Sequence, residues 1–165
     1  MERSIIESVM NNSIKLIITL IVPQLAGLIG ALFTTPNIDG WYAGIVKPMI
    51  NPSAWVFGPV WTTLFVLMGI AAYIVWRKGL ERREVKIALG LFLGQLVLNT
   101  LWSIIFFGMQ SPGAAFVELV FLWVAIVASI VAFAKVSRPA AWLLAPYILW
   151  VSFAGYLNFS IWMLN

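Results

Sequence analysis

The chain has 165 residues, of which 62% are hydrophobic and 10% charged, with ten Lys/Arg against six Asp/Glu. Soluble domains carry about 25% charged residues, so this composition excludes an ordinary soluble enzyme, a disordered tail and a nucleic-acid-binding module. His and Cys are both absent from the sequence. A disulfide, a thiolate nucleophile, a Cys/His zinc site and an imidazole base are therefore excluded, and no metal site is expected.

Charged residues divide the chain into five apolar blocks, at 16–33, 54–76, 87–109, 114–134 and 140–164. About 20 helical residues cross a hydrocarbon core of roughly 30 Å, and a backbone in lipid must pair its own polar groups. The blocks predict an all-α membrane protein, a bundle of five transmembrane helices that forms a single domain over 1–165. Pro23, Gln24 and the length of the first block argue against a secretory signal peptide.

The basic residues indicate an orientation. Nine of the ten flank the blocks on one side of the predicted bundle, and only Lys47 lies on the other. Because basic loops stay in the cytoplasm, we expect a cytoplasmic N-terminus and a C-terminus outside.

One long connection, 34–53, joins the first two blocks on the outer side. Its aromatic pair Trp41-Tyr42 and its prolines Pro48 and Pro52 argue against disorder. Long loops in compact proteins are usually functional or disordered, so we expect an ordered outer lid loop.

Seven polar side chains fall inside the blocks, where they tend to line a cavity or an interface. They are Gln24, Gln95, Asn99, Ser103, Glu118, Ser152 and Asn158. Span directions place Trp61, Asn99, Trp102, Trp150 and Asn158 at one level beneath the lid. Four tryptophans, Trp61, Trp102, Trp123 and Trp150, are too deep for an interfacial belt. They either wall a pocket for a flat apolar ligand or pack the bundle, whereas the other five tryptophans fit a belt.

Two further features inside the blocks have open interpretations. Glu118 lies near the outer boundary, where we expect it to be solvated or paired with Lys47 rather than to hold a proton. Gly90 and Gly94 form a G-x-x-x-G spacing that lets two helices approach closely. That contact could join two copies of the chain or two helices of one copy.

Short motifs extend from about Pro36 to Trp162. They are Trp41-Tyr42-Ala43, Lys47-Pro48, Asn51-Pro52, the run from Trp55 to Trp61, Met68-Gly69, the run from Gly94 to Asn99 with Trp102 and Phe106-Phe107-Gly108, and Pro146 to Trp150 with Tyr156-Leu157-Asn158. Together they resemble the TspO/MBR family, the tryptophan-rich sensory proteins and translocator proteins, and a prokaryotic member is expected.

The resemblance implies a five-helix bundle, commonly a homodimer, that requires no cofactor and binds porphyrins and other large apolar ligands beneath the first loop. The implied ligand-binding residues are Trp41, Tyr42, Lys47 and Pro48 in the lid and Trp61, Asn99, Trp102, Phe106, Trp150, Ala154, Leu157 and Asn158 in the pocket. A family dimer contact through the third span favours Gly90 and Gly94 as dimer residues. Some bacterial members are associated with light-dependent porphyrin breakdown, for which Trp61 and Trp150 are the catalytic candidates.

Three departures from the family pattern limit what the resemblance implies. Met49-Ile50 stand where the family often has Ser-Trp, and Ala114 stands where the animal proteins have a tryptophan. No basic residue follows Tyr156, so the animal cholesterol motif is absent. Drug-like ligands are therefore expected to bind poorly, and cholesterol binding is not indicated.

The combined prediction is a receptor or sensor for tetrapyrroles such as protoporphyrin IX or haem-like ligands, integral to the membrane and most consistent with a bacterial cell membrane. Light- and oxygen-dependent porphyrin degradation in the same pocket is the alternative function. Transport of tetrapyrroles or lipids ranks last, because the sequence shows no inverted repeat, broken-helix pair or coupled carboxylate chain.

Overall fold

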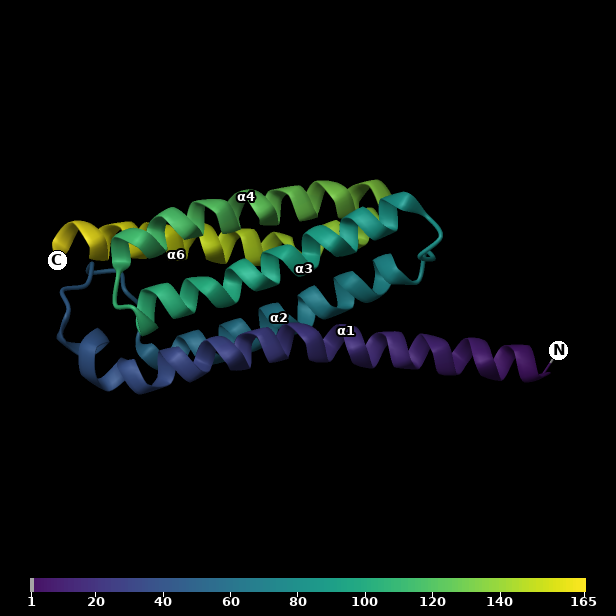
Figure 1. Ribbon diagram of the computed structural model, residues 1–165, viewed down its shortest axis with the longest axis horizontal. Helices are drawn as coiled ribbons and strands as arrows, with labels where there is room; N and C mark the ends of the chain where they lie inside the picture. The colour runs from purple at the N-terminus through teal and green to yellow at the C-terminus, as the bar shows by residue number, and fades with distance from the viewer. Residues whose placement is uncertain (1) are drawn as a thin grey trace.

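The computed structural model describes residues 2–165, with side chains from Asn11 onward, as a bundle of long helices. The elements are α1 (Glu2–Asn37), the short π-helix η1 (Ile38–Tyr42), α2 (Ala54–Trp76), α3 (Arg83–Ser103), the π-helix η2 (Ile104–Gly108), α4 (Pro112–Val136), α5 (Arg138–Trp142) and α6 (Ala145–Leu164). No strand occurs in the described part of the chain. The chain termini lie at opposite ends of the bundle (Figure 1).

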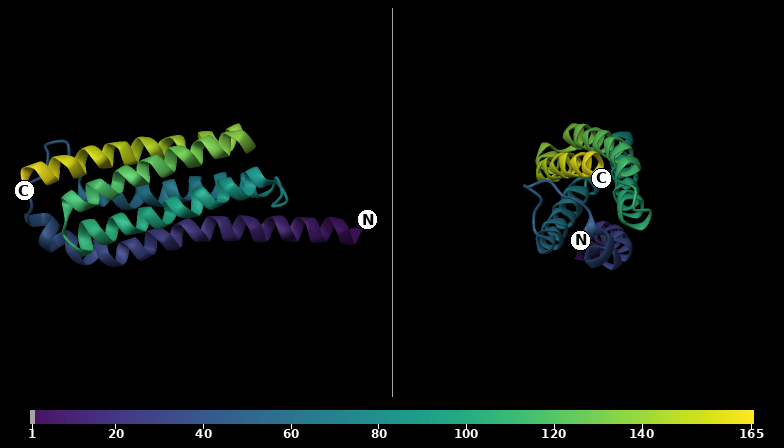
Figure 2. Two further views of the ribbon diagram at one scale, coloured as in Figure 1. Left: turned by 45° about the horizontal axis from the view of Figure 1, so that its top comes forward. Right: turned by 90° about the vertical axis from the view of Figure 1, so that its left-hand side faces the viewer.

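Five helical segments are long and apolar enough to cross a membrane: Asn11–Tyr42, Ala54–Trp76, Arg83–Gly108, Pro112–Val136 and Arg138–Leu164. They run side by side along the long axis of the molecule in the left view of Figure 2 and are seen end-on in the right view. Many large apolar side chains on their outer faces are exposed, as lipid contact requires, with Leu32, Val97 and Leu149 each about two-thirds exposed. The predicted all-α bundle of five membrane-spanning helices is confirmed.

The predicted lid loop over 34–53 is wrong for its first half. Helix α1 continues through Pro36 to Asn37, η1 follows directly, and Ala43 and Gly44 are still helical. Proline inside a helix removes one hydrogen bond, and here side chains pair with nearby carbonyls, Asn37 Nδ2 with the Phe33 oxygen at 2.9 Å and Thr34 Oγ1 with the Gly30 oxygen at 3.1 Å. Only residues 45–53, which we call the lid segment, connect α1 to α2 without regular structure.

The two ends of the bundle differ in charge. The basic end contains the start of α1, the α2–α3 connection and the α4–α5 connection, and it carries nine of the ten Lys/Arg residues. The lid end contains η1, the lid segment, the turn at 109–111 and the end of α6, and Lys47 is its one basic side chain among residues 11–165. This asymmetry matches the distribution from which a cytoplasmic N-terminus is predicted.

Helices pack most closely in the basic half. A Cβ atom added to Gly69 of α2 would lie 2.6 Å from the backbone oxygen of Thr19 in α1, so only glycine permits this approach. Around this contact Met68, Ala71 and Val75 are fully buried. Gly69 therefore lets α1 and α2 approach closely at this point.

Candidate ligand cavity

A cavity of about 520 Å³ lies in the lid half of the bundle, between α1, α2, α3 and α6. This volume falls within the range of about 300–1,000 Å³ usual for small-molecule sites. Its walls combine small residues of α1, such as Gly27 and Gly30, with aromatic residues of the other three helices. A Cβ atom on Gly27 would overlap the ring of Phe65, so this glycine lets the ring approach α1 closely.

Nine of the twelve predicted ligand-binding residues line this cavity. They are Tyr42, Trp61, Asn99, Trp102, Phe106, Trp150, Ala154, Leu157 and Asn158. The remaining three, Trp41, Lys47 and Pro48, are not among the lining residues. Trp41 instead packs edge-on against Phe106, with ring centroids 5.5 Å apart, and so supports the cavity wall from behind.

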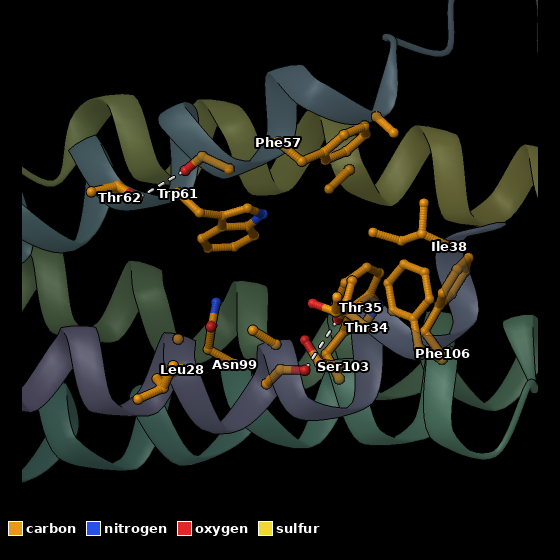
Figure 3. A pocket seen from close by; sticks show the side chains of 18 of the residues that line it. Leu28, Thr34, Thr35, Ile38, Phe57, Trp61, Thr62, Asn99, Ser103 and Phe106 are labelled. Atoms are coloured by element: carbon orange, nitrogen blue, oxygen red, sulfur yellow. Dashed lines mark hydrogen bonds between the residues drawn. The ribbon is translucent and has the colours of Figure 1, made fainter.

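Stacked aromatic pairs form the walls. Trp61 stacks on Phe65 with centroids 5.5 Å apart, and Trp102 stacks on Phe106 at 5.0 Å. Phe57 meets Trp150 edge-on at 5.8 Å. Figure 3 shows the Trp61 ring projecting from α2 into the open space, with Asn99 of α3 facing it from the opposite wall. A flat apolar molecule entering this space would meet ring faces and edges.

The two cavity amides already have partners within the protein. Asn99 Nδ2 donates to the Tyr147 hydroxyl at 3.2 Å, and that hydroxyl donates to Gln95 Oε1 at 2.7 Å. Asn158 Oδ1 accepts from Trp102 Nε1 at 2.9 Å, and Asn158 Nδ2 donates to the Pro112 oxygen at 2.7 Å. These bonds join α3 to α6 and to the start of α4, so the amides hold the walls in place.

One buried polar atom among the described lining residues has no hydrogen-bond partner. Trp150 Nε1 is buried and has no hydrogen-bond acceptor. Several polar side chains of the wall are bonded internally, such as Thr62 Oγ1 to the Gly58 oxygen and Tyr42 Oη to Asn51 Oδ1. No lining residue carries a charged side chain. The cavity can therefore offer a ligand aromatic surface, but no charge of its own.

Comparison with known proteins decides the family, because residues 19–163 match the TspO/MBR family. The chain belongs to the TspO/MBR family. It is 50% identical over 139 residues to the Tryptophan-rich protein TspO of Chlorobaculum tepidum, covering 84% of this chain and 88% of that protein. It is 42% identical over 147 residues to the human Translocator protein (88% and 86%) and 38% identical over 127 residues to the Tryptophan-rich sensory protein of Cereibacter sphaeroides (77% and 78%).

Membership in the TspO/MBR family and five apolar spans establish an integral membrane protein.

The family resemblance did not point to the α1 side of the cavity, where Gln24, Gly27, Gly30, Thr34, Thr35 and Ile38 all form part of the lining. Small residues at this spacing indicate close helix packing. Their pattern is the same whether they pack against another helix or line a cavity. Trp55, expected in an interfacial belt, is 76% exposed and also contributes to the lining.

Several contacts hold the lid segment of this TspO/MBR protein in place at the lid end of the bundle. Lys47 Nζ lies 4.7 Å from the centre of the Tyr42 ring and donates to the backbone oxygens of Ala43 and Ile45 at 3.3 and 3.0 Å. The side chain of Asn165 accepts from the Val46 N–H at 2.9 Å and donates to the Val46 oxygen at 3.0 Å. These contacts hold Val46 and Lys47 of the lid segment in place.

The expectation for Glu118 is wrong. This side chain is 7% exposed, and neither carboxyl oxygen has a hydrogen-bond partner, so it is neither solvated nor paired with Lys47. Helix α4 turns this position toward the bundle interior, beside the buried residues Ala115, Leu119 and Leu122. Because α4 is apolar on nearly every face, the sequence pattern could not fix which face turns inward.

Gly90, Gly94 and Trp123 are all exposed on the outside of the bundle. Added Cβ atoms at Gly90 and Gly94 would meet nothing within 4 Å, and both glycines are exposed on α3. The interpretation of this G-x-x-x-G spacing as a contact between two helices of one copy is therefore wrong. Trp123 is 40% exposed and donates to Ser152 Oγ at 2.9 Å, which joins α4 to α6 away from the cavity.

Proposed function

We propose that this TspO/MBR protein is a membrane receptor that binds porphyrins and other large, flat, apolar ligands in the cavity beneath the lid segment. The observation that carries the proposal is the aromatic enclosure of about 520 Å³, into which Trp61 projects and whose wall includes Trp150. The sensory and translocator names of its relatives are consistent with such a role.

Ligand burial would supply the affinity. Each Å² of apolar ligand surface removed from water contributes about 25 cal/mol, and stacking on indole rings adds to this. The walls are held by the Trp102–Asn158 and Asn99–Tyr147 hydrogen bonds before any ligand enters. A preformed site avoids the free-energy cost of ordering side chains on binding.

The test is a titration of the protein, in neutral nanodiscs and in the dark, with protoporphyrin IX, followed through the porphyrin's own absorbance. The double variant Trp61→Ala, Trp150→Ala should weaken binding at least tenfold, because it removes two aromatic rings from the cavity wall. Trp142→Ala is the matched control, since Trp142 is 76% exposed and outside the cavity lining. Equal affinity in the double variant and the control would reject the proposal.

We also propose that two copies of the chain pair through the exposed face of α3. This face carries Gly90, Leu93, Gly94, Val97 and Leu101, all exposed in the single chain. Glycine at two successive turns lets a second helix approach closely. The variant Gly94→Leu should shift the protein from dimer to monomer in sedimentation, whereas Leu149→Ala, on the exposed face of α6, should leave the dimer intact. A dimer unchanged by Gly94→Leu would reject this contact.

A further inference from the structure

A second hollow among the described residues is a groove at the basic end of the bundle, between α3 and α4. It has a volume of about 370 Å³ and shares no lining residue with the ligand cavity. Ile87 and Val131 in its lining are each about half exposed, so the groove opens on the outer face of the bundle. The lining consists of five apolar and two charged residues: Ile87, Leu91, Ala128, Val131 and Ala132, with Glu84 and Lys135.

The lining residues of each helix lie on one stripe. Glu84, Ile87 and Leu91 follow one another at three- and four-residue spacing along α3, and the residues from Ala128 to Lys135 do so along α4. Helix α3 begins and α4 ends at the basic end (Figure 1), so the two charged residues lie at the outer end of the groove. Each stripe spans about 10 Å at the helical rise. The groove therefore runs inward from the basic end and becomes apolar within one turn.

The apolar part of the groove fits a hydrocarbon chain. Both helices belong to membrane spans, Arg83–Gly108 and Pro112–Val136, so the open side of the groove faces lipid. Two alanines of α4 leave room opposite Ile87 and Leu91 of α3. The walls of an empty groove lose dispersion contacts, and an acyl chain that lies in the groove restores them. The expected occupant therefore has at least one acyl chain.

Lys135 supplies a cation at the outer end of the groove. Its side chain is exposed in the last turn of α4, and no carboxylate lies within ion-pair distance of it among residues 11–165. Glu84 Oε2 lies 4.0 Å from Arg82 Nε, so the charge of Glu84 is partly offset. A phosphate group at this point would gain a charge-assisted hydrogen bond from the Lys135 ammonium group.

The charges around the groove favour an anionic head group over a zwitterionic one. Arg83 and Lys86 in the first turn of α3 and Arg138 at the start of α5 are exposed. The acids of the α2–α3 connection and the first turn of α3 are Glu81 and Glu84. Basic residues close to a membrane surface attract anionic lipids, and they repel the ammonium group that a zwitterionic head group adds to its phosphate. The outer end of the groove therefore complements a lipid of negative net charge.

The geometry does not favour a second copy of the chain as the occupant. The proposed dimer face of α3 runs from Gly90 to Leu101, whereas the groove stripe of the same helix includes Ile87 and Leu91. At about 100° of rotation per residue, the centres of the two stripes lie about 100° apart around α3. A helix packed on the glycines therefore leaves the groove open to lipid.

We propose that this groove is a binding site for an anionic phospholipid, with one acyl chain between α3 and α4 and the phosphate on Lys135. The site shares no residue with the cavity and lies at the other end of the bundle, so the inference is independent of porphyrin binding. The phosphate belongs to a lipid rather than to a free ion, because the apolar lining contributes to binding only when a chain is attached.

The experiment is native mass spectrometry of the full chain in detergent, with equimolar dioleoyl phosphatidylglycerol and dioleoyl phosphatidylcholine. The two lipids share their acyl chains and phosphate and differ in net charge. The wild-type protein should bind phosphatidylglycerol in preference, and Lys135→Gln should lower that preference about fivefold, the contribution of one basic residue near an anionic surface. Lys78→Gln should leave it unchanged, because Lys78 is exposed at the same end and outside the groove. Phosphatidylethanolamine in place of phosphatidylcholine should give the same preference.

A second pair of variants tests the acyl chain. Ala132→Leu places a larger side chain in the groove and should weaken both lipids by the same factor. Ala134→Leu is the matched control, since Ala134 is exposed on the same helix and outside the lining, and it should weaken neither lipid. Glycerol phosphate, which has no acyl chain, should not displace the bound lipid.

Four results would overturn the site. Lys135→Gln and Lys78→Gln with equal effects, or with none, would assign any preference to the overall charge of the basic end. Stronger binding of phosphatidylethanolamine than of phosphatidylglycerol would place an ammonium group at Glu84. A change of oligomeric state in Ala132→Leu without loss of lipid would mean that a second copy covers the groove. Displacement by glycerol phosphate would mean that the acyl chain contributes nothing.

Discussion

The two halves of the bundle are built from the same helices but pack them differently. In the basic half, small residues such as Ala71 and Ala72 bring helices together, and Val75, Val85 and Phe133 are fully buried. In the lid half, large rings stack on neighbours along their own helix, as Trp61 does on Phe65 and Trp102 on Phe106, and the space between helices stays open. Residue size and ring stacking therefore separate a half that stabilises the fold from a half that can accept a ligand.

The largest expected effect compares equivalent truncations in the two halves. Phe133 is fully buried and packs against Phe92 with centroids 5.8 Å apart, so Phe133→Ala should lower the free energy of unfolding by about 3–5 kcal/mol. Trp61 already faces open space, so Trp61→Ala should lower it by only about 1–2 kcal/mol while weakening porphyrin binding. Titration with SDS, monitored by circular dichroism, measures both. Equal losses would show that the lid half is as tightly packed as the basic half.

A smaller effect of opposite sign is expected at Glu118, in the lid half. Its two carboxyl oxygens are buried without partners, and removing such a group in favour of an apolar side chain of similar length stabilises a protein by about 1–2 kcal/mol. Glu118→Met should therefore raise the SDS midpoint, whereas Glu81→Gln, at the exposed α2–α3 connection, should leave it unchanged. A lowered midpoint for Glu118→Met would contradict the conclusion that the Glu118 carboxyl has no stabilising partner.

The helices of this fold could be predicted from the sequence because lipid imposes a strong constraint. A charge-free block of about 20 residues has no other way to satisfy its backbone in a bilayer, and Ala54–Trp76 is such a block. The path of α1 through Pro36 was not predictable in the same way, because proline and glycine at 36 and 40 are typical of a loop. The bonds that the Thr34 and Asn37 side chains make to carbonyls one turn back depend on geometry that a pattern does not contain.

The cavity was predictable in part for a different reason. Antiparallel spans fix the depth of each residue, so Trp61, Asn99 and Trp150 could be assigned to one level before their contacts were known. Depth does not fix the rotation of a helix that is apolar on all sides. For that reason the inward position of Glu118 and the outward position of Gly90 and Gly94 became evident only in three dimensions.

The smallest expected effect concerns the lid segment, the longer of the two connections without regular structure at the lid end. Asn165 bonds both backbone groups of Val46, and exposed hydrogen bonds of this kind each contribute about 0.5–1.5 kcal/mol. Asn165→Ala should therefore let the segment open more often and raise both the association and dissociation rates of protoporphyrin IX about two- to fivefold, measured by stopped-flow absorbance. Affinity should change less than twofold, because the aromatic walls are untouched. Gln110→Ala is the control, since Gln110 bonds Asn37 at the same end without contacting the segment. Unchanged rates in Asn165→Ala would show that the ligand enters by a route other than the lid, such as the side of the cavity where Leu28 and Trp55 are exposed.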